Sequence, residues 1–228
     1  SLVLFQIDPL KKLNLETDST IALIKEGFKI GFEIWLSYPQ NLKLFERSAV
    51  TKAQTVLDED LKVGPAKEVA IKDFNFFFIR QDPPVDMNYL TNCYLLEIHK
   101  KFNKKPFFVN DPSGIKNFTE KISPLYFNNI IPSTIISSNI GSMIDMMEEY
   151  GTVVLKTLYN KGGQDVYKTS KRQKAESIFK KLTQNFNTPI IIQEFLYEVK
   201  YGDKRIILVD GVPLGVVNRI PKKGNFKA

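Results

Sequence analysis

The first half of the chain alternates short apolar runs with amphipathic segments. Residues 2–7 form an apolar run that stops at Asp8-Pro9, and helical spacing of apolar residues follows over 20–30, after the capping residues Asp18 and Ser19. The same logic predicts strands at 32–36, 74–79 and 107–109 and a second helix at 88–102. This order predicts a parallel sheet of the α/β kind.

Two segments of this half interrupt the pattern. Residues 47–63 are polar and alternate weakly, which predicts an exposed hairpin. Arg80-Gln81-Asp82-Pro83-Pro84 closes the strongest apolar run, at what would be the carboxyl end of a strand. Ligands bind beyond those ends in open α/β sheets, so we expect this loop to form a wall of a site.

The second half repeats the alternation in a different order. We predict helices at 140–150 and 171–186 and strands at 152–156 and 190–194, with a subdomain boundary near 117–124. The last two β-rich runs, 204–209 and 212–218, flank Asp210-Gly211, a strong hairpin signal.

Composition is typical of a folded protein, because 43% of the 228 residues are hydrophobic and 25% are charged. The net charge of +7 comes from lysines scattered among acidic residues, so we expect a solvated basic surface rather than a nucleic-acid partner.

The single cysteine, Cys93, excludes an internal disulfide and fits a reducing cytoplasm. It lies in a predicted helix without a basic neighbour, so its side chain is expected to pack rather than react. One histidine, His99, argues against a histidine-rich metal site. No apolar run is long enough to span a membrane, and the sequence leaves open whether the chain forms a homo-oligomer.

Cationic and glycine residues of the second half indicate a polyphosphate site. Lys156 ends an apolar run and is soon followed by Gly162-Gly163, so an ammonium and a flexible backbone loop are expected to meet phosphates, with Lys121 upstream. The loop matches no Walker A pattern. The strand that runs into Gln193-Glu194-Phe195-Leu196 is expected to read the edge of adenine through free main-chain groups.

These features resemble the ATP-grasp ligases in their order and spacing, together with Gly202-Asp203-Lys204-Arg205 and Asn218-Arg219-Ile220-Pro221. The first half narrows the resemblance to the prokaryotic glutathione synthetase family through Asp8-Pro9, Asn14, Asp18-Ser19 and the Asp82-Pro83-Pro84 loop. The matches span essentially the whole chain.

The resemblance implies an ATP-dependent ligase that joins γ-glutamylcysteine to glycine through an acyl phosphate and releases ADP and phosphate. It implies that Lys121, Lys156, Gly162 and Gly163 bind phosphates, that Gln193, Glu194, Phe195 and Leu196 frame adenine, and that Asp203 lies near the ribose. Arg205 and Arg219 would face the anionic substrate and the transferring phosphoryl group as catalytic residues. ATP and Mg²⁺ are the implied cofactors.

The chain departs from the family pattern at two places. Tyr159 stands where the family has Asp, and Asn160 replaces a glycine, for which we expect a left-handed backbone. Lys227 stands at an arginine position, and the family's magnesium ligands would follow Ala228. Both ends look truncated, so the chain alone is expected to bind nucleotide weakly without turnover.

The fold expected from the resemblance is α/β, an ATP-grasp fold. It has a parallel N-terminal domain (1–118), a small α+β lid subdomain (119–196) and the incomplete start of a β-rich subdomain (197–228). Two alternatives stay open at this stage, namely another ATP-grasp carboxylate-amine ligase and a non-catalytic nucleotide-binding module.

Overall fold

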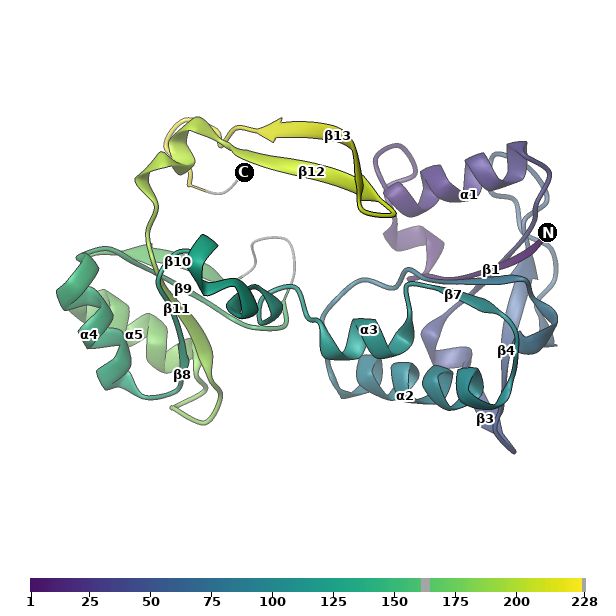
Figure 1. Cartoon of the computed structure of the whole chain (residues 1–228), viewed down its shortest axis with the longest axis horizontal. Helices are drawn as coiled ribbons and strands as arrows, with labels where there is room; N and C mark the ends of the chain where they lie inside the picture. The colour runs from purple at the N-terminus through teal and green to yellow at the C-terminus, as the bar shows by residue number, and fades with distance from the viewer. Residues whose placement is uncertain (161–164, 227–228) are drawn as a thin grey trace. The chain divides into compact units, whose positions relative to one another are not determined.

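The computed structural model describes residues 1–160 and 165–226, so the predicted phosphate-binding residues Gly162 and Gly163, and Lys227, lie outside the described residues. Contacts within the chain divide it into two units, Ser1–Glu120 and Lys121–Ala228 (Figure 1). Each unit has its own sheet and its own core. The three-part division expected from the sequence stays a prediction.

The first unit contains a seven-stranded sheet in the order β3-β4-β2-β1-β6-β7, with β5 paired to β4. The four strands β2, β1, β6 and β7 are parallel, as the sequence predicts. The strands are β1 (Leu2–Gln6), β2 (Glu33–Ser37), β3 (Lys43–Phe45), β4 (Ser48–Thr55), β5 (Lys67–Ala70), β6 (Phe76–Ile79) and β7 (Phe107–Val109).

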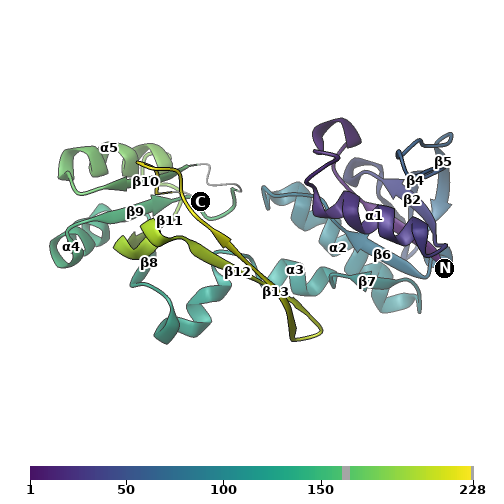
Figure 2. The ribbon, with the colours of Figure 1, turned by 90° about the horizontal axis from the view of Figure 1, so that it is seen from above.

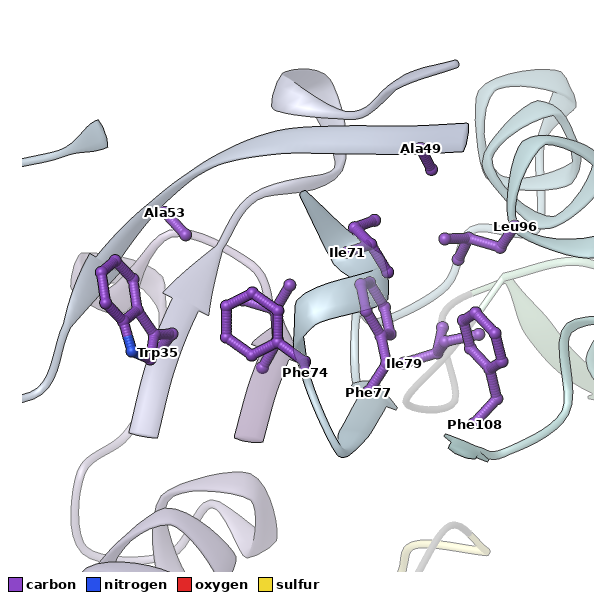
Figure 3. Packing of buried hydrophobic residues seen from close by; sticks show 10 residues of the cluster. Trp35, Ala49, Ala53, Ile71, Phe74, Phe77, Ile79, Leu96 and Phe108 are labelled. Atoms are coloured by element: carbon purple, nitrogen blue, oxygen red, sulfur yellow. The ribbon is translucent and has the colours of Figure 1, made fainter. Parts of the chain in front are cut away.

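Helices cover both faces of this sheet, which is why its parallel strands read as continuous apolar runs. Alternate residues of β1 point to opposite sides. Val3 and Phe5 pack with Ile21 and Ile24 of α1 (Ser19–Lys29), which the Asp18 side chain caps. Leu4 packs instead in the cluster of Figure 3, which contains Leu96 of α2 (Met87–Phe102). The short α3 (Pro112–Asn117) follows β7.

The expected exposed hairpin over 47–63 is wrong in part. Strand β4 pairs with β2, β3 and β5 and buries Ala49 and Ala53 in the core. Most of the neighbouring positions are only half-buried, and alanine supplies a weak hydrophobic signal. The polar appearance of the segment therefore concealed a strand of the main sheet.

The second unit contains a four-stranded antiparallel sheet in the order β10-β9-β11-β8. Its strands are β8 (Thr134–Ser137), β9 (Val153–Lys156), β10 (Val166–Thr169) and β11 (Ile190–Glu194). The helices α4 (Ile140–Tyr150) and α5 (Arg172–Leu182) lie side by side on one face and share a core with Leu155 and Ile192 (Figures 1 and 2). Helix α5 ends before the predicted position 186, because three residues with positive φ, Gln184, Asn185 and Phe186, follow it.

The predicted C-terminal hairpin is confirmed as β12 (Asp203–Val209) and β13 (Val212–Arg219). Asp210 and Gly211 both have positive φ, at 50° and 77°, as a tight hairpin turn requires. Short 3-10 helices occupy Leu10–Lys12, Pro39–Asn41, Ile71–Asp73, Ser123–Ile130 and Tyr197–Tyr201. Among the residues described, no helix has the length and apolar character needed to cross a membrane.

Cys93 lies in the core of the first unit, as predicted. Its side chain is buried on α2, and burial raises the pKa of the thiol to about 11. The thiolate is the nucleophilic form of cysteine, so this side chain is inert near neutral pH.

His99 links α2 to β4 through a buried, neutral ring. Its Nδ1 accepts a hydrogen bond from the Ala49 N–H at 2.9 Å, and its Nε2 lies 3.0 Å from the Lys105 carbonyl oxygen. A neutral ring with its proton on Nε2 satisfies both contacts, because Nε2 then donates to the Lys105 carbonyl and Nδ1 stays free to accept from Ala49. Burial lowers the pKa of His99 below its ordinary value of 6.5.

We expect the free energy of unfolding to fall as the pH drops below 6.5, because the unfolded chain then binds a proton that folded His99 does not. The stability from the neutral ring is present above the unfolded pKa and is lost as the pH falls through the folded pKa. Urea unfolding between about pH 5 and pH 8 measures this slope. In His99→Asn, an amide oxygen can still accept from Ala49 but does not titrate, so the His99 part of the slope should vanish. Equal slopes in both proteins would contradict the assignment.

Candidate functional site

The face of the second sheet that lies opposite α4 and α5 carries the predicted phosphate-binding lysine. Leu155 and Ile192 pair across β9 and β11 and belong to the helix-covered core, so their neighbours Lys156 and Gln193 point to the other face. There the Lys156 Nζ donates to the Gln193 Oε1 at 2.8 Å. The Gln193 Nε2 in turn donates to the Thr134 Oγ1 at 2.6 Å, so a chain of hydrogen bonds orients the lysine.

Lys168 on β10 belongs to the same face, and the sequence analysis did not identify it. It pairs with Val154, which lies two residues from Lys156 on β9. Its Nζ lies 3.6 Å from the centre of the Phe195 ring and 5.7 Å from that of Tyr197. The alternation of side chains over 166–169 could have indicated a strand with Lys168 on this face. The segment is short and contains one fully apolar residue, so the sequence analysis did not predict a strand there.

Lys121 reaches the loop that follows β9. Its Nζ donates to the backbone carbonyl of Asn160, four residues beyond Lys156. The sequence predicts a left-handed backbone at Asn160. Among the described residues of this loop, a positive φ is found instead at Asp165, where it is 52°. Asn160 contacts Asp165 through its side chain, with Nδ2 to Oδ2 at 2.9 Å.

The main-chain donors of the predicted adenine connector are partly used within the unit. The N–H of Glu194 donates to the Ser133 carbonyl at 3.0 Å, and that of Phe195 to the Thr152 carbonyl at 3.2 Å. The expectation of free backbone groups is therefore wrong for these two donors, and an adenine edge would need other main-chain groups of the connector. The Leu196 side chain is exposed, while Phe195 is half-buried and meets the Tyr197 ring edge-on.

At the base of the hairpin, Arg219 and Asp203 form a bidentate ion pair. The Arg219 Nε donates to one carboxylate oxygen at 3.0 Å and a terminal nitrogen contacts the other. The hydrogen bonds from Arg219 lower the pKa of Asp203. Gly202 adjoins this pair with φ 98°, and a Cβ there would lie 2.7 Å from the Arg219 carbonyl oxygen, so this position requires glycine. Arg205 is exposed on β12.

The loop after β6 lies where the sequence predicts a site wall. Arg80, Gln81, Asp82 and Pro83 line a pocket of about 600 Å³ in the first unit. Asp82 is fixed through its backbone N–H, which donates to the Asp8 Oδ2 at 2.7 Å.

Within 1–160 and 165–226, no group of three or more His, Cys, Asp or Glu side chains is arranged to hold a metal ion. The expectation that magnesium ligands follow residue 228 stays a prediction.

Two family models match the chain, one on each unit. The prokaryotic glutathione synthetase N-terminal domain matches residues 2–116, and the prokaryotic glutathione synthetase ATP-grasp domain matches residues 120–228.

Curated relatives match the whole chain. The glutathione synthetase of Bradyrhizobium diazoefficiens is 35% identical over 232 aligned residues, and that of Prochlorococcus marinus subsp. pastoris is 34% identical over 229. In each case the match covers 99% of this chain and 73% of the relative.

Solved structures share the fold at low sequence identity. An ATP-grasp RimK domain protein from Sphaerobacter thermophilus has a TM-score of 0.62 at 16% identity, covering 96% of this chain and 73% of that one. The D-cycloserine synthetase DcsG has a TM-score of 0.66 at 13% identity, covering 96% and 68%. The predicted α/β fold class, with its ATP-grasp architecture, is confirmed. Because family models match both units and relatives above 30% identity match nearly every residue, the chain belongs to the prokaryotic glutathione synthetase family.

Proposed function

We propose that this protein is an ATP-dependent ligase that joins γ-glutamylcysteine to glycine and forms glutathione, ADP and phosphate. The observation that carries the proposal is the match of both units to the two domains of the prokaryotic glutathione synthetase family. The oriented Lys156, on the face of the second sheet opposite α4 and α5, supports it, because a polyphosphate needs a fixed cation.

In this proposal the second unit binds ATP. Lys121 and Lys156 contact phosphates, together with the loop that contains Gly162 and Gly163. Gln193 holds Lys156 in position, while Phe195 and Leu196 offer apolar surface to the adenine ring. Lys168, which lies against Phe195, adds a second cation on the face of the sheet that carries Lys156.

The chemistry requires an anionic carboxylate and an anionic phosphoryl group to approach each other. Fixed cations lower the energy of the charge that develops during this transfer, and exclusion of water protects the acyl phosphate from hydrolysis. Arg205 and Arg219 are proposed as the fixed cations that stabilise the developing charge. Arg219 now holds Asp203, so it would have to exchange this carboxylate for a substrate oxygen. Mg²⁺, when bound, would neutralise phosphate charge.

The test is an assay of the protein with ATP, Mg²⁺, γ-glutamylcysteine and glycine. Glycine-dependent phosphate release with glutathione as the product supports the proposal. Release that requires a different amine or carboxylate would identify another ATP-grasp ligase. Nucleotide binding without any release would identify a non-catalytic module.

Arg219→Lys should reduce the rate of phosphate release more than it reduces the affinity for ATP. The planar guanidinium holds two oxygens at once, as it does with Asp203, and a lysine cannot reproduce this geometry. Parallel measurements of release and of ATP binding by calorimetry test the difference. Arg172→Lys, at an exposed pair on α5, is the matched control. A near wild-type rate in Arg219→Ala would place Arg219 outside the active site.

A further inference from the structure

The first unit contains a pocket that the nucleotide chemistry does not use. It has a volume of about 600 Å³ and lies where β6 and β7 end, at the edge of the parallel strands where α/β sheets bind ligands. Its polar lining includes Arg80, Asp82, Tyr89, Asn110, Thr119 and Glu120. The volume is that of a small-molecule site.

Arg80 supplies the positive charge of this pocket. Its Nε donates to the Thr20 Oγ1 at 3.0 Å, and a terminal nitrogen donates to the Ser19 Oγ at 2.9 Å. Both partners are neutral hydroxyl groups at the start of α1. Over the described part of the chain, no carboxylate is recorded in an ion pair with Arg80. The guanidinium is therefore held in place by neutral hydroxyl groups rather than by an ion pair.

The same pocket carries negative charge and a hydroxyl group. Asp82 and Glu120 supply carboxylates, and the hydrogen bond from the Asp82 N–H to Asp8 fixes the loop. Burial raises the pKa of Tyr89 to about 12, so its hydroxyl stays protonated and can donate. A guanidinium beside carboxylates complements a ligand that carries both a carboxylate and an ammonium group.

We propose that this pocket binds the free amino-acid end of the dipeptide substrate, with Arg80 on its α-carboxylate and Asp82 or Glu120 on its α-ammonium group. This assignment rests on the proposed function. The γ-glutamyl end of the dipeptide is remote from the cysteine carboxylate that accepts the phosphoryl group. Binding energy from such a non-reacting part positions the reacting part, so a separate charged pocket for it serves catalysis.

The first experiment varies the ligand. The full chain is titrated by calorimetry with γ-glutamylcysteine, with 4-aminobutanoylcysteine, which lacks the α-carboxylate, and with glutarylcysteine, which lacks the α-ammonium group. We expect each truncated ligand to bind about 10- to 100-fold more weakly than the intact dipeptide, the loss expected for one charge-assisted contact. Equal affinity for all three ligands, or no binding of the dipeptide, would overturn the proposal.

The second experiment varies Arg80. Arg80→Gln should weaken γ-glutamylcysteine about 10- to 100-fold but should leave 4-aminobutanoylcysteine unchanged, because this ligand has no carboxylate to lose. Arg47→Gln, at an exposed residue of the same unit, should change neither affinity. Equal weakening of both ligands by Arg80→Gln would mean that Arg80 only supports the fold, and would overturn the assignment.

The two proposals can fail separately. If glutathione forms but Arg80→Gln leaves the KM for the dipeptide unchanged, the pocket assignment is wrong and the function stands. If the pocket binds the dipeptide through Arg80 but no glutathione forms, the function is wrong and the pocket assignment stands for a ligand of this class.

Discussion

Lys156→Met is expected to lower the affinity for ATP by about one to two decades, a loss of about 1.5–3 kcal/mol. Methionine keeps the length and the apolar stem of lysine but removes the charge that would contact phosphate. The structure is consistent with this expectation, because the hydrogen bond from the Lys156 ammonium to Gln193 at 2.8 Å orients the lysine side chain. Calorimetric titration with ATP measures the effect.

The matched control for this variant is Lys174→Met, at an exposed position of α5 on the helix-covered side of the same sheet. It removes the same charge from the same unit, so it corrects for any long-range effect of net charge. Equal ATP affinities of the wild-type protein and Lys156→Met would remove Lys156 from the nucleotide site.

Phe77→Ala is expected to destabilise the first unit by about 3–5 kcal/mol, a large part of the stability of a typical domain. The Phe77 side chain is fully buried at the centre of β6, and its ring centre lies 5.4 Å from that of Phe108. Alanine would leave a cavity that the tightly packed neighbours in Figure 3 cannot fill.

Urea unfolding followed by tryptophan fluorescence measures this change in the first unit, because Trp35 is the only tryptophan and lies in the same cluster. Phe45→Ala, at a side chain that is 70% exposed, is the control and should change the free energy of unfolding by less than about 0.5 kcal/mol. If both variants unfolded at the same urea concentration, the packing of Phe77 would not limit the stability of this unit.

Local patterns predicted the elements whose signal lies within a few neighbouring residues. Asp18 caps α1 and Asp210-Gly211 turns the hairpin, because each acts through its own backbone neighbours. The burial of strand β4 in the main sheet and the existence of strand β10 were not predicted, because their buried residues are small or few and their stability comes from pairing with distant strands.

The sequence by itself determined the family, because motif order and spacing are properties of the linear chain. It also identified Lys156, Gln193 and Arg219 as members of a candidate site. Only the tertiary structure showed that Lys168 shares a face with Lys156, that Arg219 holds Asp203, and that Arg80 is fixed by hydroxyl groups of α1. These relations depend on strand register and on side chains that meet across 16 to 61 positions of the chain, and no local pattern encodes such contacts.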